Sequence, residues 1–364
     1  MMKTKKKGIG EIYENIPFWD NGDWKEMTFE SREEFKIVLE DEYFKEPGEY
    51  DLDDVVYEFQ KQGLKFTADK RYCDFGEGTK DFIKYWDFES LKNRKGCFFH
   101  SNGKKFYLPR DYYHFINFAP IVNKIKRIED FPDIHDAQLH MALYEWIGEL
   151  NYQHGVILKK RQFGSSFYHA CKLINLLWFE TKPVLRIGAS LSAYITGVNG
   201  TWKMLNEYRN FLNKHTAWYR PMNPGGVGEW QQKIEYIENG RKTERGRKGT
   251  LQSVSFEQSD TAGVGGFCTL FFYEEAGIAK TMNKTYEFML PALTAGEITT
   301  GYFIASGTVG DLKQCEPLRK WMYAAKGNGF YEVPNKWAND KGTVINTGLF
   351  IPEQWSMPPH IDDF

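Results

Sequence analysis

The segment VILKKRQFGSSF, residues 156–167, combines residue types that suit phosphate binding. An apolar run meets two lysines and an arginine, and Gly164 then leads into two serines. Backbone N–H groups at a helix N-terminus bind phosphate because they lack partners and because the helix dipole favours anions. Ser165, however, occupies the position where such a loop usually carries its lysine. Three interpretations follow: a nucleotide site with its lysine elsewhere, a dead nucleotide site, or an ordinary strand-to-helix turn.

A working site would divide its roles among the neighbouring side chains. Lys159 and Lys160 end the predicted strand, and either side chain is long enough to reach the β- and γ-phosphates. Arg161 could stabilise charge that develops on the γ-phosphate. The hydroxyl of Ser165 or Ser166 could bind magnesium. If the site is an ordinary turn, these cations are simply solvated.

The segment TLFFYEEAG, residues 269–277, delivers two adjacent carboxylates at the end of an apolar run. An NTPase needs one carboxylate to hold magnesium and a second to orient the attacking water. Adjacent strand residues point to opposite sides. We therefore expect Glu274 to hold magnesium and Glu275 to activate water. Aspartate is more usual at the first position, and the alternative is two solvated glutamates after a strand.

The segment FIASGTVG, residues 303–310, is a third apolar run that ends in small polar residues. Ser306, Gly307 and Thr308 could contact the γ-phosphate and couple its loss to movement. A plain glycine turn is the alternative.

The elements that must position these motifs alternate between short apolar strands and helices. This pattern predicts a mostly parallel sheet with helices on both faces. The strands are expected at 155–159, 184–190, 251–258, 268–277 and 302–310, and the helices at 136–150 and 165–179. Ligands bind at the carboxyl ends of strands in such sheets. All three motifs should therefore lie along one edge.

In this order, KKRQFGSSF, LFFYEEAG and ASGTVG resemble the Walker A, Walker B and coupling motifs of tailed-bacteriophage terminase large subunits. These ATPases drive genome DNA into procapsids. The loop matches the family pattern at Arg161, Gln162, Gly164 and Ser166. Some members carry the functional lysine near the start of the loop, at the position of Lys159. The resemblance implies a P-loop NTPase fold of the additional-strand catalytic-glutamate type, with ATP and magnesium as cofactors.

Further roles come from the resemblance alone. It implies that Gln138 contacts adenine, the alternative being a polar residue on a helix face. Double-stranded DNA, the portal protein and the small terminase subunit are the implied partners. A homo-oligomeric ring is the implied active form. The implied location is the host-cell cytoplasm, with transient presence at the portal vertex of the procapsid.

The chain divides into three expected regions. Residues 1–125 form an irregular, aromatic-rich subdomain, residues 126–340 the ATPase domain, and residues 341–364 a C-terminal linker. The hairpin expected within CFFHSNGKKFYL, residues 97–108, belongs to the first region. The nuclease domain that large subunits normally carry is expected to be absent, because Asp362 and Asp363 alone cannot form its magnesium site.

Composition limits the other possibilities. The formal net charge of −2 means that any DNA contact must come from a local patch. The best candidate is a flexible basic loop at 239–250, although such runs are often only solvated surface; its cations are Arg241, Lys242, Arg245, Arg247 and Lys248. No apolar run approaches the ~20 residues that cross a bilayer, so no membrane partner is expected. Five scattered cysteines fit a reducing compartment.

Two other functions remain open at this point. A helicase-like ATPase that remodels DNA would share the same motifs. A catalytically silent nucleotide-binding scaffold would explain why Ser165 replaces lysine and why Glu274 replaces aspartate.

Overall fold

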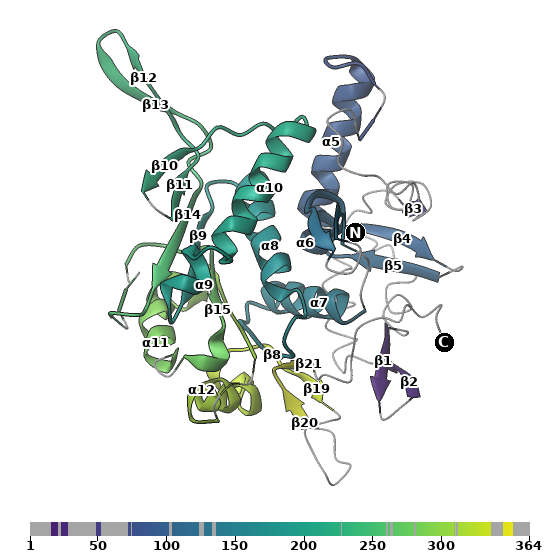
Figure 1. The fold of residues 1–364 in the computed structure, drawn as a ribbon, viewed down its shortest axis with the longest axis vertical. Coiled ribbons are helices and arrows are strands. Elements are labelled where there is room, and N and C mark those ends of the chain that lie inside the picture. Colours follow the sequence, from purple (N-terminus) through teal and green to yellow (C-terminus); the bar gives the residue numbers. More distant parts are fainter. Residues whose placement is uncertain are drawn as a thin grey trace, which may run out of the picture.

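The computed structural model describes residues 16–20, 23–27, 49–51, 72–73, 75–101, 104–123, 127–132, 136–226, 228–259, 261–262, 265–279, 282–308, 310, 312–335 and 345–351. The three motifs of the sequence follow strands of one eight-stranded sheet, whose order is β10-β11-β14-β9-β15-β18-β8-β21 (Figure 1). Six of its strands are parallel to one another: β8 (Gly155–Lys159), β9 (Val184–Ala189), β14 (Thr250–Ser255), β15 (Leu270–Glu274), β18 (Tyr302–Gly307) and β21 (Leu349–Ile351). Two antiparallel strands complete one side, β10 (Asn223–Gly226) and β11 (Glu229–Gln231).

Strand order places β18 between β8, which leads into the glycine loop, and β15, which carries the acids. This inserted strand is the arrangement expected for the additional-strand class. The predicted mostly parallel sheet is thus confirmed, and its carboxyl edge collects the ends of β8, β15 and β18.

Both faces of the sheet are covered, and the alternation along β15 shows how. Leu270 and Phe272 join a core with α6, α7, α8 and α10, whereas Phe271 and Tyr273 join a core with α11 and α12. The first layer contains α7 (Asp136–Leu150), α8 (Ser165–Phe179) and α10 (Thr201–His215), with the short α9 (Ser192–Thr196) against β9. The second contains α11 (Met282–Leu293) and α12 (Leu312–Tyr323), with the 3₁₀ turns η2 (Ala276–Ile278) and η3 (Lys326–Asn328) nearby (Figure 1).

The region before α7 is more regular than the sequence suggested. It holds the helices α5 (Lys80–Lys95) and α6 (Arg110–Phe118) and the strands β1 (Ile16–Asp20), β2 (Asp23–Met27), β3 (Glu49–Asp51), β4 (Cys97–Ser101), β5 (Lys104–Leu108), β6 (Ile121–Asn123) and β7 (Ile128–Asp130). The expected hairpin is present as β4 and β5, while its turn, residues 102–103, lies outside the described residues. Eight of the nine residues of α6 are buried, and this helix packs against α8. This helix was not predicted from the sequence, although it contains both polar and apolar residues.

Two expectations about the later segments are corrected. Residues 341–364 were expected to be a linker, but Leu349 and Ile351 are buried and β21 pairs in parallel with β8. The segment 239–250 was expected to be a flexible loop, but β12 (Ile234–Glu238) and β13 (Arg241–Arg245) form a hairpin that projects from the body (Figure 1). Small two-stranded pairs also join β16 (Thr294–Ala295) to β17 (Ile298–Thr299) and β19 (Val333–Asn335) to β20 (Ile345–Thr347). Among the helices described, none has the length and apolar character that crossing a membrane requires.

Candidate functional site

The glycine loop between β8 and α8 is held in a conformation that only glycine accepts easily. Gly164 has φ 81° and ψ 10°, the left-handed region, and directly precedes α8. A Cβ atom at this position would lie 2.7 Å from Nε2 of Gln138. The same Nε2 donates a hydrogen bond of 2.9 Å to the carbonyl oxygen of Phe163. Gln138 is buried and supports the loop through this hydrogen bond. Its role toward adenine stays a prediction.

The start of the loop is open to solvent. Arg161 and Gln162 are exposed, and Gln162 has φ 57°. Lys160 is half-buried, and its backbone N–H donates to the carbonyl oxygen of Ile351 on β21 at 3.0 Å. The edge strand β21, which was not predicted from the sequence, thus supports the loop.

Lys159 is the lysine whose ammonium group lies among the other motif residues. Its side chain is 6% exposed, and its Nζ donates to Oγ1 of Thr308 at 3.3 Å. The same Nζ lies 3.9 Å from Oε1 of Glu275. The end of β8 therefore supplies a buried positive charge that faces both acids and the turn after β18.

Glu274 is the deeply buried member of the acid pair, at 3% exposure. Oγ of Ser166 donates to its Oε1 at 2.6 Å, and Oγ1 of Thr201 donates to its Oε2 at 3.3 Å. Burial raises the pKa of Glu274, while the hydrogen bond from Ser166 and the charge of Lys159 oppose that rise. This carboxylate is costly to keep ionised, which favours a cation nearby.

Glu275 lies just beyond the end of β15 and has φ 51° and ψ 45°. A non-glycine residue in this left-handed region is uncommon, and such strain occurs often at functional sites. Its side chain is 29% exposed, so it reaches solvent where Glu274 does not. The two acids do face different surroundings as predicted. The cause, however, is the backbone turn at Glu275 rather than strand alternation.

The turns after β15 and β18 touch backbone to backbone. A Cβ atom at Gly277 would lie 1.9 Å from the carbonyl oxygen of Thr308, and one at Gly307 would lie 2.2 Å from the nitrogen of Gly277. Ser306 is buried, with its Oγ 3.0 Å from Oγ of Ser165. A displacement of either turn must therefore move the other.

Sequence reasoning missed two residues that touch this site. Thr201 contacts Glu274 from the first position of α10, and the only signal was a helix start after the segment GVNG. His169 contacts Ser165, and the signal was its position four residues later on the same helix.

The oxygen atoms of Ser166 and Glu274 suit magnesium, which prefers hard oxygen ligands and usually keeps several waters and substrate phosphate oxygens. No group of three or more His, Cys, Asp or Glu side chains poised for a metal occurs among the described residues. A site in which the protein provides one hydroxyl and one carboxylate fits a magnesium ion that arrives with a nucleotide.

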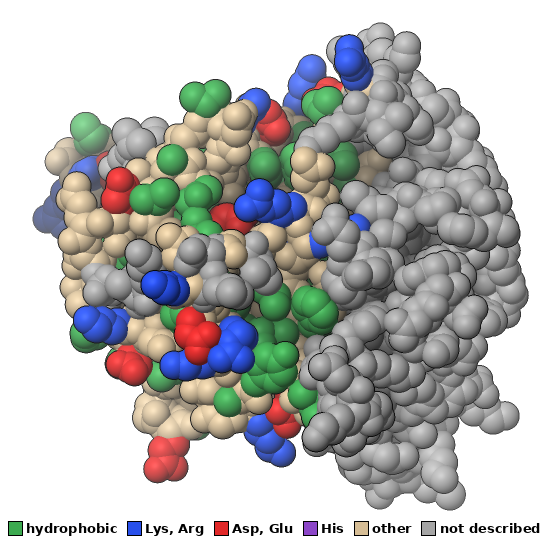
Figure 2. Space-filling model, turned by 60° about the horizontal axis from the view of Figure 1, so that its bottom comes forward, with side chains coloured by type: hydrophobic (Ala, Val, Ile, Leu, Met, Phe, Trp, Pro, Cys, Tyr) green, Lys and Arg blue, Asp and Glu red, His purple; other side chains and the backbone are tan. Residues whose placement is uncertain are grey.

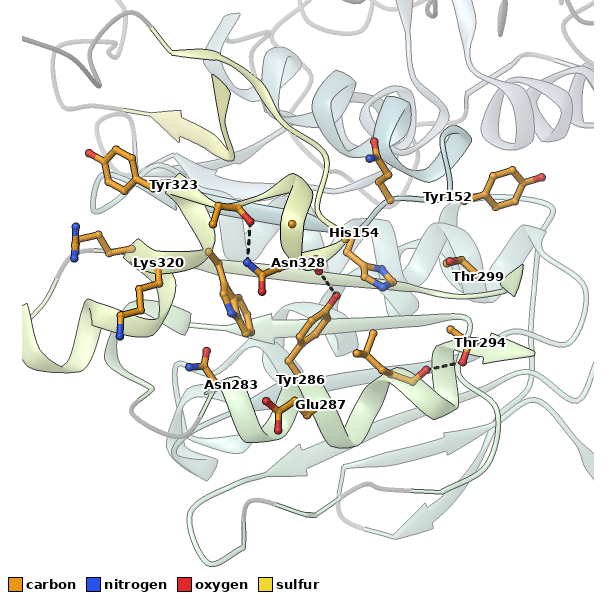
Figure 3. Close-up of a pocket in the computed structure, with 17 residues that line it drawn as sticks. Tyr152, His154, Asn283, Tyr286, Glu287, Thr294, Thr299, Lys320, Tyr323 and Asn328 are labelled. Carbon is orange, nitrogen blue, oxygen red and sulfur yellow. Dashed lines mark hydrogen bonds between the residues drawn. The ribbon is translucent and has the colours of Figure 1, made fainter. Parts of the chain in front are cut away.

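A pocket of about 950 Å³ lies at the opposite edge of the sheet (Figure 3). His154, which directly precedes β8, lines it together with Asn283 and Tyr286 of α11 and Tyr323 of α12. Tyr286 donates from its hydroxyl to the carbonyl oxygen of Asn328 at 2.8 Å. Because the pocket borders the amino-terminal end of β8, it is separate from the glycine loop at the carboxyl end.

Comparisons with known proteins give structural likeness only. No family model matches the sequence, and no curated protein matches it. Among solved structures, the chain is similar to the large terminase ATPase domain of Thermus phage P74-26, with 12% identity, 43% of this chain and 60% of that chain covered, and a TM-score of 0.32. It is also similar to the HK97 bacteriophage large terminase, with 14% identity and a TM-score of 0.40; the match covers 59% of this chain and 41% of that chain. The chain thus spans 60% of one of these structures and 41% of the other.

Proposed function

We propose that this chain is the ATP-hydrolysing motor domain of a DNA-packaging machine, a terminase large subunit that translocates double-stranded DNA into viral procapsids. The observation that carries the proposal is the meeting of Lys159, the Ser166–Glu274 pair and Glu275 at one edge of the sheet. Ser166 and Glu274 are 108 positions apart in the chain. Each of these groups matches a requirement of phosphoryl transfer.

Each residue has a distinct task in this mechanism. Backbone N–H groups of the first turn of α8, together with Lys159, bind the β- and γ-phosphates. Ser166 and Glu274 hold magnesium, which neutralises charge on the phosphates when it is bound. Glu275 orients the attacking water, and Arg161 stabilises charge on the γ-phosphate.

Release of the γ-phosphate would change the surroundings of Lys159, which already contacts Thr308. Because the turn containing Thr308 is in backbone contact with Gly277, the change passes to the residues that follow Glu275. The coupling motif would in this way report nucleotide state to α11 and α12.

Contact with DNA is assigned to the hairpin of β12 and β13. This hairpin exposes Arg241, Lys242 and Arg245. Nζ of Lys242 lies 2.5 Å from Oε2 of Glu235, with which it forms an ion pair. On the face drawn in Figure 2, basic side chains are interspersed with acidic and hydrophobic ones over the described part of the surface. The glutamates Glu235, Glu238 and Glu244 balance these charges over the hairpin, so the proposed contact depends on the cations of β13 alone. Exposed cations on a projecting strand can contact a phosphate backbone without reading base sequence.

Salt titration tests the DNA contact. Replacing Arg241, Lys242 and Arg245 by alanine should reduce the slope of log affinity against log salt by roughly 0.9 for each lost phosphate contact. A control exchanges three exposed lysines on other elements, Lys182, Lys320 and Lys326. An equal loss in both variants would remove the hairpin from the DNA-binding surface.

A catalytically silent nucleotide-binding module is the second candidate. Its motivation is that Ser165, which is 2% exposed, stands where such a loop usually carries its lysine and provides no positive charge. Nucleotide binding without turnover would support it. A helicase-like motor would instead separate the strands of a tailed duplex, and stimulation of turnover by procapsids would favour the packaging motor.

Steady-state ATP turnover with magnesium tests the central proposal. Glu275→Gln should raise the barrier by roughly 2–4 kcal/mol and slow turnover by two to three decades, while ATP binding survives. Glu287→Gln, at an exposed position on α11, is the matched control and should be unaffected. Equal turnover in the wild type and Glu275→Gln would show that another group activates water.

A further inference from the structure

A buried chain of polar side chains runs beneath the glycine loop. His169 of α8 has its Nδ1 3.0 Å from Oγ and 2.8 Å from the carbonyl oxygen of Ser165. Its other ring nitrogen, Nε2, lies 2.6 Å from Oε1 of Glu145 on α7. His169 is 1% exposed and Glu145 is 2% exposed, so water does not compete for these hydrogen bonds.

Lys172 holds the far end of this chain. Its Nζ lies 2.9 Å from Oε2 of Glu145 and 3.6 Å from Asp111 of α6, and the residue is 1% exposed. Burial alone would raise the pKa of Glu145, but Lys172 and His169 outweigh burial and hold that pKa below its usual range. Glu145 is therefore ionised and accepts hydrogen bonds only, so Nε2 of His169 must donate.

The imidazole of His169 also reaches the other two motifs. Its ring stacks on Phe272 of β15 with centroids 4.0 Å apart and planes 13° apart, two residues before Glu274. Through Ser165 it reaches Oγ of Ser306 on β18. One side chain thus contacts the loop and the acid-bearing strand, and reaches the coupling strand through one hydroxyl.

We propose that His169 is a positioning residue for the phosphate-binding loop. Because Nε2 donates a hydrogen bond to Glu145, the ring is held in one orientation, and Nδ1 stays in contact with Ser165. The Ser165 hydroxyl is then held between His169 and Ser306. This holds the first turn of α8, which carries Ser166, in register with Glu274.

This role accounts for the residue that follows Gly164. Ser165 is 2% exposed and its hydroxyl lies 3.0 Å from both His169 and Ser306, so a lysine side chain at this position would have to displace these neighbours. The phosphate-binding charge at Lys159 and the structural hydroxyl at Ser165 therefore belong together. The expected effect on turnover rests on the proposed ATPase function, whereas the effect on loop order does not.

A double-mutant cycle separates positioning from general stability. His169→Gln can still donate to Glu145 from its amide but loses the group at Nδ1, and Ser165→Ala removes only the hydroxyl. Each change should lower kcat for ATP about tenfold with little change in KM. The double variant should fall about tenfold as well, because His169 acts through Ser165. His154→Gln, a buried histidine at the opposite edge of the sheet, is the matched control.

Amide hydrogen exchange of residues 163–168 without nucleotide provides the second measurement. His169→Gln and Ser165→Ala should speed exchange of these amides equally, while His154→Gln should not. Losses in kcat that multiply to about a hundredfold in the double variant, or unchanged exchange in both single variants, would overturn the proposal. Absence of ATP turnover in the wild type would instead count against the ATPase function, and the exchange measurement would still decide the role of His169.

Discussion

Lys159→Met most directly tests whether Lys159 binds the phosphates in place of the lysine that usually follows the glycine of such a loop. Methionine keeps the apolar stem that β8 buries but removes the ammonium group that lies 3.3 Å from Thr308. Lys160→Met, one residue further on, is the matched control. If Lys159 binds the phosphates, its loss should reduce turnover far more than the loss of Lys160.

The size of the effect follows from the burial of Lys159. Two unit charges 4 Å apart at an effective dielectric constant near 20 interact by about 4 kcal/mol. Because the side chain is only 6% exposed, solvent screens the interaction weakly. Loss of one preorganised donor to a developing charge commonly costs roughly 2.7–4 kcal/mol. We therefore expect kcat/KM for ATP to fall by two to three decades.

The assay compares turnover, binding of a fluorescent ATP analogue and thermal unfolding for both variants. Lys159→Met should bind the nucleotide more weakly and turn it over slowly, and it should unfold near the wild-type temperature because its apolar stem remains. Lys160→Met should retain most of the turnover. A larger loss in Lys160→Met than in Lys159→Met would refute the assignment of the phosphate contact.

Three further outcomes follow from the same geometry. Burial raises the pKa of Glu274, so its ionised form destabilises the fold above the folded-state pKa, and this cost disappears below the lower pKa of the unfolded chain. Glu274→Gln should therefore raise the unfolding temperature at neutral pH, by a margin that shrinks as the pH falls, and it should lower magnesium-dependent turnover. Gly277→Ala places a methyl group 1.9 Å from the carbonyl oxygen of Thr308 and should cost about 1–3 kcal/mol of stability in denaturant titrations, whereas Gly327→Ala, which meets no neighbour within 4 Å, should not. Lys172→Met removes the ammonium group shared by the buried carboxylates of Asp111 and Glu145 and the half-buried carboxylate of Glu149. It should lower the free energy of unfolding by roughly 3–5 kcal/mol, and an unchanged value would mean that the cluster is hydrated.

The local parts of the site could be predicted from the sequence because each motif ends an apolar strand. The runs before Lys159, Glu274 and Ser306 are short, apolar and followed by small or charged residues, and the structure has strands at all three. Parallel pairing then brings their carboxyl ends to one edge. This is why Lys159 and Thr308, 149 positions apart, could be expected near each other.

Other features could not be predicted from the sequence because they depend on neighbours that only the folded chain brings together. β21 has only three residues, and its burial depends on the neighbouring β8 rather than on its own sequence. The contact between His169 and Glu145 joins two helices across 24 positions. Ser165, His169 and Lys172 recur at helical spacing on α8, but the sequence does not show that a buried acid on α7 faces them. Glu145 lies on a helix whose buried side chains include Gln138 and His140 as well as apolar residues, so its partner on α8 is not evident from composition.

The exchange of roles between positions 159 and 165 explains why the loop departs from the usual pattern. A lysine after Gly164 reaches the phosphates from the first turn of the helix. Here that turn faces His169 and Ser306 instead, so it can carry only a small side chain. In the proposed function the charge comes instead from Lys159, which ends β8. Ser165→Lys should therefore fail to rescue Lys159→Met, because the new ammonium group would be directed into the buried cluster rather than toward the phosphates.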